Sequence, residues 1–396
     1  MKSNHISSQL MLKEIKIPSN LIMKKNIQTK YPLNLNENDK QIFDQIINYK
    51  ITVPNTQKLT NAFVTNNGLV LKNGLLKKKC ALNLISKNDH TFYLSYWRKT
   101  LEQFLVCKLG KSLPSIKLNN DKTYLIIHSN WLNYSFWITE YLNRLVRIEK
   151  EYGFKNIILL YPEEWDNIPY IVDSLKAFEI STFKIPSGNH LFVKNLILPE
   201  VREITSYFYP EHIKQTRDKL IEEANKRSKI SEFHKKIYLT RGKNVKRAIA
   251  NEDELQKYFR NNEYEIISFE LLSIWDQIKY INSVDILFTI HGAGFANVMF
   301  MKEGSYALEF LERDFAYYAN PFPHLKLASA VGVYYAYQLC SSDKTKNISF
   351  QQLKKTNVKD RIEHVDRNIS VNLDELNKNR ILLETKLQQG KTDATV

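Results

Sequence analysis

A histidine and two glycines interrupt an apolar run in the second half of the chain. The segment DILFTIHGAGFANVMFMKEGSYALEF covers residues 285–310, and its first apolar stretch ends at His291, directly before the Gly-Ala-Gly of residues 292–294. Glycine allows a tight turn and lets a ligand approach where a Cβ would block it. A helix that begins near Phe295 would point free N–H groups and its positive dipole end at the same space, which suits a diphosphate. A strand–helix turn that only requires a positive φ would explain the same glycines.

Two series of alternating strands and helices must position this turn. The first series is predicted as a strand at 123–129, a helix at 135–153, a strand at 156–162 and a helix at 168–180. The second is predicted as strands at 236–241, 263–269, 284–291 and 305–310, with helices from 251 and over 271–283. Such alternation implies parallel sheets with right-handed crossovers. Ligands of open α/β sheets bind beyond the carboxyl ends of the strands, where the glycine turn lies.

Length and local patterns divide the chain further. A chain of 396 residues is too long for one compact core. Residues 62–80 carry Asn-Asn-Gly and Lys-Asn-Gly turn signals and predict small β hairpins. We therefore expect an N-terminal region over 1–122, an α/β domain over 123–230 and a second α/β domain over 231–396. Asn251 with Glu254 fits a capping box at the start of a helix.

Composition restricts the partners and the compartment. Lys and Arg exceed Asp and Glu by 57 to 42, which gives a net charge of +15 and favours anionic partners. The three cysteines, Cys80, Cys107 and Cys340, show neither disulfide nor metal spacing, which favours a reducing compartment. Residues 1–20 lack a signal-peptide core, and no stretch reaches the roughly 18 apolar residues of a spanning helix. We expect a cytoplasmic protein that contacts the anionic inner face of a membrane peripherally.

Four stretches, in this order, resemble the motifs of glycosyltransferase family 61. They are NYSFWITEYLNRL (133–145), YLTRGKNVKRAIANEDEL (238–255), HGAGFANVMFMKEGSYALEF (291–310) and ISVNLDEL (369–376). The family includes capsular polysaccharide biosynthesis proteins, plant β-1,2-xylosyltransferases and the EGF-domain O-GlcNAc transferase. The resemblance implies a GT-B-like fold with two facing Rossmann-like domains, here with a small β-rich N-terminal region. It also implies inverting transfer from a nucleotide sugar, UDP-linked, to a hydroxyl of a capsular or lipopolysaccharide glycan.

The resemblance also implies site residues. Glu140 occupies the position of the catalytic base, and Arg144 is the candidate for binding the acceptor. The residues implied to bind the donor are Arg241, Arg247, His291, Gly292, Ala293, Gly294, Asn297 and Glu309, with Glu309 on the ribose hydroxyls. No Asp-x-Asp occurs in the chain, so we expect no metal and no other cofactor. The partners would be the nucleotide sugar and a glycan or lipid-linked glycan, with no nucleic acid.

Several observations keep alternatives open. Arg144 lies four residues after Glu140, a spacing typical of a structural helix pair, and pairing would lower the pKa of a base. Phe136 stands where the family has a histidine, and Asn143 where it has a proline. Gly292 and Gly294 partly match a dinucleotide fingerprint, so a Rossmann-type dinucleotide-dependent enzyme is the alternative. Nucleic-acid binding would require basic residues concentrated on one face, but they are spread along the chain.

Overall fold

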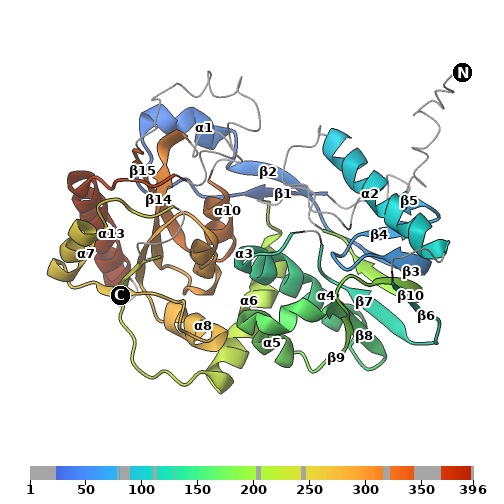
Figure 1. Cartoon of the computed structure of the whole chain (residues 1–396). Helices are drawn as coiled ribbons and strands as arrows, with labels where there is room; N and C mark the ends of the chain where they lie inside the picture. Colours follow the sequence, from blue (N-terminus) through green and yellow to red (C-terminus); the bar gives the residue numbers. More distant parts are fainter. Residues whose placement is uncertain are drawn as a thin grey trace, which may run out of the picture.

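The fold is a mixed α/β arrangement with two large sheets at opposite ends of the molecule (Figure 1). The computed structural model describes residues 24–77, 80, 90–109, 114–129, 131–201, 207–241, 247–314, 322–342 and 367–393. The N-terminal half of the chain builds the first sheet, and residues 236–340 build the second. The prediction of two separate α/β sheets is confirmed.

The first sheet has eight strands. They are β3 (Thr56–Val64), β4 (Val70–Lys72), β5 (Leu75–Leu76), β6 (Ser115–Leu118), β7 (Thr123–Ile126), β8 (Ile157–Pro162), β9 (Ser181–Ile185) and β10 (His190–Pro199). β7, β8 and β9 pair in parallel, and β10 pairs parallel with β7 and antiparallel with β3. The predicted hairpins form β3, β4 and β5, and positive φ at Asn73 (53°) and Gly74 (73°) makes the turn between β4 and β5.

The second sheet has five parallel strands in the order β12-β11-β13-β14-β15. They are β11 (Lys236–Leu239), β12 (Glu265–Ile267), β13 (Ile286–Ile290), β14 (Tyr306–Glu312) and β15 (Tyr334–Cys340). All five residues of β13 are buried, which explains its uninterrupted apolar sequence. In the register, Leu239 pairs with Thr289, and Thr289 pairs with Glu309. The residues that follow β11 and β13 therefore emerge side by side at one edge of the sheet.

Helices cover both sheets. They are α1 (Lys40–Asp44), α2 (His90–Lys108), α3 (Tyr134–Phe136), α4 (Leu142–Tyr152), α5 (Pro169–Lys176), α6 (Pro210–Arg227), α7 (Glu252–Asn261), α8 (Ile274–Asn282), α10 (Pro323–Ala330) and α13 (Leu373–Asp393). Short 3-10 helices are η3 (Glu37–Asp39), η6 (Glu163–Asn167) and η7 (Ala293–Phe300), and η5 (Trp137–Tyr141) is a π-helical turn between α3 and α4. α10 and β15 were not among the elements that the sequence patterns predicted.

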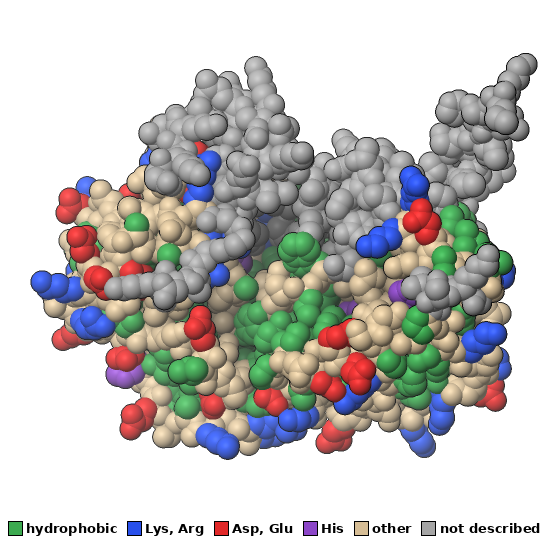
Figure 2. Space-filling model, in the orientation of Figure 1, with side chains coloured by type: hydrophobic (Ala, Val, Ile, Leu, Met, Phe, Trp, Pro, Cys, Tyr) green, Lys and Arg blue, Asp and Glu red, His purple; other side chains and the backbone are tan. Residues whose placement is uncertain are grey.

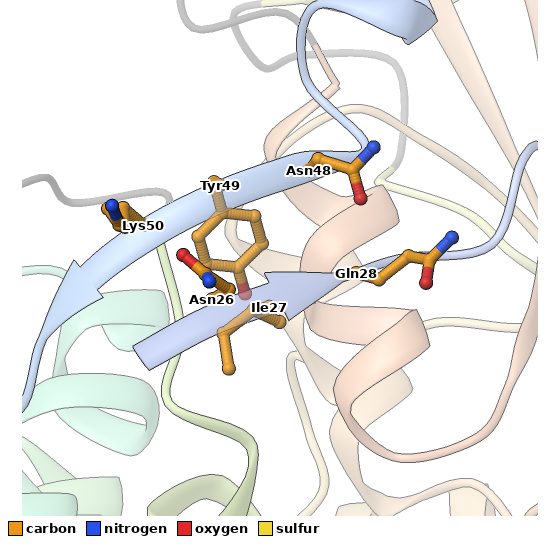
Figure 3. A pocket seen from close by; sticks show the side chains of 6 residues that line it. All are labelled: Asn26, Ile27, Gln28, Asn48, Tyr49 and Lys50. Atoms are coloured by element: carbon orange, nitrogen blue, oxygen red, sulfur yellow. The ribbon is translucent and has the colours of Figure 1, made fainter. Parts of the chain in front are cut away.

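The N-terminal residues contact both halves. β1 (Lys24–Gln28) and β2 (Asn48–Thr52) form an antiparallel ribbon, drawn in blue across the top of Figure 1. A hollow on this ribbon is shown in Figure 3, and it is lined by Asn26, Ile27, Gln28, Asn48, Tyr49 and Lys50. Between the two strands, the N–H of Leu33 donates to the carbonyl of Tyr335 at 2.9 Å. The segment that precedes β3 in the sequence thus contacts β15 of the second sheet, whereas β3, β4 and β5 belong to the first sheet.

The two halves share a hydrophobic core cluster. Ile138 and Leu142 from the first half belong to the same cluster as Ile278 and Met299 from the second, and all four are fully buried. α6 is a highly charged helix that packs against both α4 and α8. Its buried positions, including Leu220, explain why so polar a helix holds a central place.

The predicted capping box at Asn251 is wrong. Asn251 stands at the N-cap of α7, but its side chain makes no capping hydrogen bond. Its Oδ1 accepts from the N–H of Val371 at 3.0 Å, and its Nδ2 donates to the carbonyl of Val371 at 2.9 Å. A tertiary contact with the C-terminal segment has replaced the local one.

Candidate functional site

The glycine turn lies at the carboxyl end of β13 and leads into η7. The N–H of His291 continues the ladder to the carbonyl of Phe310 at 2.9 Å, and Gly292 then adopts φ 154°, a value that favours glycine. The N–H of Phe295 donates to the carbonyl of Gly292 at 3.1 Å. The N–H groups of residues 292–294 have no hydrogen bond to another described residue. This leaves a row of donors at the turn that a ligand can use.

The two predicted arginines meet this turn. A Cβ on Gly292 would lie 2.9 Å from Nη1 of Arg241 and 3.6 Å from Nη1 of Arg247, so the turn needs glycine for space as well as for conformation. Nη1 of Arg241 also lies 3.5 Å from the carbonyl oxygen of His291. Arg247 has φ 63°, a left-handed conformation that is uncommon outside glycine and is often found at functional sites. The structure thus brings Arg241, Arg247 and Gly292 together, and the parallel register of β11 and β13 accounts for the position of Arg241.

Glu309 lies behind the turn in a buried hydrogen-bond cluster. Its Oε1 accepts from Nδ1 of His291 and from Nδ1 of His324, both at 2.5 Å, and its Oε2 accepts from the hydroxyl of Tyr335 at 2.6 Å. The side chain of Glu309 is 0% exposed. Both oxygens are therefore occupied by protein donors. The prediction that Glu309 binds the ribose hydroxyls is corrected, because the carboxylate faces inward and holds two imidazoles instead.

The protonation states of this cluster follow from burial and pairing. Burial alone would raise the pKa of the Glu309 carboxyl, but the two imidazoles hold that pKa well below its usual range. Burial lowers the pKa of His291, against the opposing effect of Glu309. Burial also raises the pKa of the Tyr335 hydroxyl, so this group stays a donor. Glu309 is accordingly ionised, and His291 is neutral with its proton on Nδ1.

Glu140 and Arg144 lie in the first half, in a closed ion pair. Nε and Nη2 of Arg144 donate to Oε1 of Glu140 at 3.1 and 3.0 Å, and Nη1 donates to the carbonyl of Ile127 at 2.6 Å. The two side chains are 3% and 1% exposed. The predicted acceptor-binding role of Arg144 is corrected, since its guanidinium is directed into the core. The same burial does not support Glu140 as a base that reaches an acceptor hydroxyl.

Residues 134–308 match the family described as Glycosyltransferase 61. The chain carries a glycosyltransferase 61 domain. It is therefore a glycosyltransferase, and a sugar donor and an acceptor are its substrates. The comparison with curated proteins gave no match. The matched range contains the turn, both arginines and the Glu140–Arg144 pair, and it ends one residue before Glu309.

Asn297 connects the two halves of the glycosyltransferase 61 domain. Its Nδ2 donates to the carbonyl of Gly294 at 3.1 Å, and its Oδ1 accepts from the hydroxyl of Tyr134 at 2.6 Å. The side chain is buried. These contacts support the turn locally, and the predicted contact of Asn297 with the donor stays a prediction. Tyr134 belongs to the predicted NYSFW motif, so two separate motifs of the domain meet here.

The cluster behind the turn also has the composition of a metal site. Among the described residues, His291, Glu309 and His324 are the set of His, Cys, Asp and Glu side chains close enough to share an ion. The 2.5 Å separations between Nδ1 and Oε1 are even shorter than ordinary N–H···O hydrogen bonds, so the three groups already touch one another directly. An ion with bonds of about 2.0–2.2 Å to each ligand would have to displace both protons and push the groups apart. The donors thus fit a hydrogen-bonded cluster, and the expectation of a site without metal stays a prediction.

Sequence reasoning missed three residues of this region: His324, Tyr335 and Tyr134. His324 and Tyr335 follow the last predicted strand of the motif, and no spacing rule joins them to Glu309. Tyr134 was visible in the NYSFW stretch but carried no assigned role. The departure at Phe136 places a half-buried ring that packs against the shared core cluster.

The surface around the domain is mixed. On the face shown in Figure 2, hydrophobic side chains gather in the middle of the molecule, and charged side chains lie mostly toward its margins. In the part of the chain that the structure describes, no helix combines the length and the apolar character needed to cross a membrane.

Proposed function

We propose that this chain is an inverting glycosyltransferase that transfers a sugar from a UDP-linked donor to a hydroxyl of a capsular or lipopolysaccharide glycan. The observation that carries the proposal is the convergence of Arg241 and Arg247 on the backbone of Gly292. Guanidinium groups offer paired donors to phosphate oxygens, and the N–H groups of residues 292–294 add further donors. A diphosphate fits this combination of charge and direction.

The chemistry requires stabilisation of a departing diphosphate. The acceptor oxygen forms a bond to the anomeric carbon while the bond from that carbon to the diphosphate oxygen breaks, and attack from the opposite face inverts the configuration. Negative charge grows on the diphosphate as this bond breaks. Preorganised donors at that position lower the barrier because they need no reorganisation during the reaction. Arg241, Arg247 and the turn amides serve this purpose in the proposal, without a metal.

The domain division assigns the two substrates to two sides. Residues 231–396 hold the donor and residues 123–230 border the acceptor, in a GT-B-like arrangement. The hydrogen bond between Tyr134 and Asn297 supports this assignment, because it sets the first helix of the acceptor side against the donor turn. The net charge of +15 suits an acidic or lipid-diphosphate-linked acceptor at the cytoplasmic face of an anionic membrane.

The test is nucleotide release. We expect the purified chain to release UDP from at least one sugar of a panel with UDP-, GDP- and CMP-linked donors. UDP, but not NAD, should raise the melting temperature, since UDP at 100 times its Kd stabilises the folded state by about 2.7 kcal/mol. Absence of release from every donor, together with a shift by NAD alone, would favour the dinucleotide-dependent alternative.

Arg241→Ala tests the arginine directly. Loss of a charged hydrogen bond should weaken UDP binding by about 1.5–3 kcal/mol in isothermal titration calorimetry. Arg260→Ala is the matched control, because Arg260 is exposed on α7 and bonds only Gln256 among the described hydrogen bonds. Equal UDP affinity in the two variants would remove Arg241 from the donor site.

A further inference from the structure

Two imidazoles share one carboxylate oxygen behind the glycine turn. His291 and His324 both donate through Nδ1 to Oε1 of Glu309, and Tyr335 donates to Oε2. Three donors fix the rotation of the carboxylate, and the carboxylate fixes the orientation of both rings. Because Nδ1 of His324 is occupied, Nε2 is the ring nitrogen that His324 can offer to a ligand.

His324 packs against residues on both sides of the turn. Its ring centroid lies 5.0 Å from that of His291, which precedes Gly292, and 4.9 Å from that of Phe295 in the first turn of η7. The rings of His324 and Phe295 are stacked, at an interplanar angle of 24°. α10 thus places the imidazole of His324 beside the glycine turn, which Arg241 and Arg247 also approach.

Exposure distinguishes the imidazoles from their anchor. The side chains of His291 and His324 are 13% and 10% exposed, whereas Glu309 is 0% exposed. No described residue accepts from or donates to Nε2 of His324. The carboxylate is therefore sealed inside the protein, and the rings it orients keep a small open edge.

We propose that His324 is a further binding residue for the donor diphosphate, presented beside His291 by Glu309, which acts as the positioning residue for both. This inference rests on the proposed function and extends it to a residue outside the matched family range. In this proposal His324 binds as the imidazolium, with Nδ1–H on Glu309 and Nε2–H on a phosphate oxygen, and Arg241 and Arg247 add positive charge at the same turn. His324 and two arginines then surround the diphosphate from neighbouring elements, and the ring of His291 packs beside that of His324.

The experiment compares ligands that differ in their phosphates. UDP, inorganic pyrophosphate and uridine are titrated by calorimetry into the wild-type chain and into His324→Phe, which keeps the ring volume and the stacking but removes the nitrogens. We expect UDP and pyrophosphate to bind about 10- to 100-fold more weakly and uridine to change less than about twofold. His234→Phe is the matched control, because His234 is 58% exposed and remote from the cluster in the contacts it makes.

Glu309→Gln tests the positioning role. This variant keeps the shape but removes the charge that orients both rings, so its loss of UDP affinity should exceed that of His324→Phe. The double variant, Glu309→Gln with His324→Phe, should bind UDP no more weakly than Glu309→Gln alone, because both changes disrupt the same hydrogen-bonded cluster. His324→Gln retains a hydrogen-bond donor, so it should bind UDP more tightly than His324→Phe. It also provides a test if the His324→Phe variant does not fold.

The outcomes separate this inference from the proposed function. UDP affinity unchanged in both His324 variants would overturn the assignment, and so would an equal loss for uridine and UDP, which indicates a collapsed site. The wild-type chain could bind pyrophosphate and yet release no nucleotide from any nucleotide sugar. That result would contradict the proposed function and leave His324 as an anion-binding residue. A wild-type chain that binds neither UDP nor pyrophosphate would overturn both.

Discussion

Two glutamates of the predicted motifs, Glu140 and Glu309, are both buried, but their surroundings differ. Glu140 accepts hydrogen bonds from Nε and Nη2 of Arg144 on one oxygen, and Nη1 of that guanidinium donates to the carbonyl of Ile127. Glu309 receives two imidazoles and one hydroxyl, none of which carries a permanent charge. The charge of the first carboxylate is balanced by a permanent cation beside it, whereas the second carboxylate is stabilised by three hydrogen bonds.

This difference separates a structural carboxylate from one that serves a site. A closed ion pair has no remaining need for a ligand, and its charges cancel inside the core. A carboxylate held by imidazoles passes its orientation to groups whose outer edges remain partly exposed. Both residues are glutamates within motifs of the family, so the hydrogen-bond partners of each carboxylate decide its role.

Breaking the ion pair should have the largest effect on stability. Arg144→Met leaves the Glu140 carboxylate buried without its cation, which should lower the free energy of unfolding by about 3–5 kcal/mol in urea denaturation. The double variant with Glu140→Gln should recover much of this loss, since neither charge is then buried. A different outcome would establish Glu140 as the base. In that case the single variant Glu140→Gln would fold as well as wild type and bind UDP, but its turnover would fall by a factor of about 10²–10⁴.

A buried lysine on α10 sharpens the comparison, because within the described part of the chain it has neither an ion pair nor a hydrogen bond. Lys326 is fully buried, and its Nζ makes no hydrogen bond to the described residues and lies 4.8 Å from the ring centroid of Tyr207. Burial lowers the pKa of Lys326 to about 8 from its ordinary value of 10.5. Between these values the unfolded chain binds the proton and the folded chain does not, so stability should rise with pH through this window.

Lys326→Met should therefore stabilise the protein. At pH 7 the gain should be about 3 kcal/mol, since one pKa unit corresponds to about 1.4 kcal/mol, and it should shrink toward zero as the pH approaches about 10.5. Urea denaturation across this pH range measures it. Lys302→Met, at an exposed position, should show no such trend. A gain that stays constant with pH would mean that packing, and not the buried charge, is responsible.

The sequence was informative where physical rules are local or follow from sheet geometry. The patterns of residues 284–291 and 305–310 predicted strands of a parallel sheet, and the meeting of Arg241 with the glycine turn follows from the register of β11 and β13. The helical spacing of Glu140 and Arg144 predicted their pairing, but it could not show that both side chains are buried.

The remaining errors share a physical cause, which is contact between residues far apart in the chain. Asn251 had a local capping partner in the sequence, yet its amide pairs with the backbone of Val371, 120 residues away. His324 reaches Glu309 only because α10 packs against η7 and β15. No periodicity encodes such contacts, since they depend on how complete elements pack.

The smallest expected effect concerns the hydrogen bond that joins the two regions. Tyr134→Phe removes the donor to Oδ1 of Asn297 while Asn297 still supports Gly294, so the free energy of unfolding should fall by about 1 kcal/mol. Tyr170→Phe is the matched control: its ring packs on Tyr134 at 5.3 Å, but its hydroxyl has no hydrogen bond to a described residue. UDP affinity should stay within about twofold of wild type, because the turn keeps its arginines and its amides. A loss of UDP affinity as large as that of Arg241→Ala would show that the acceptor-side helix shapes the donor site, and the separation drawn between the two regions would then fail.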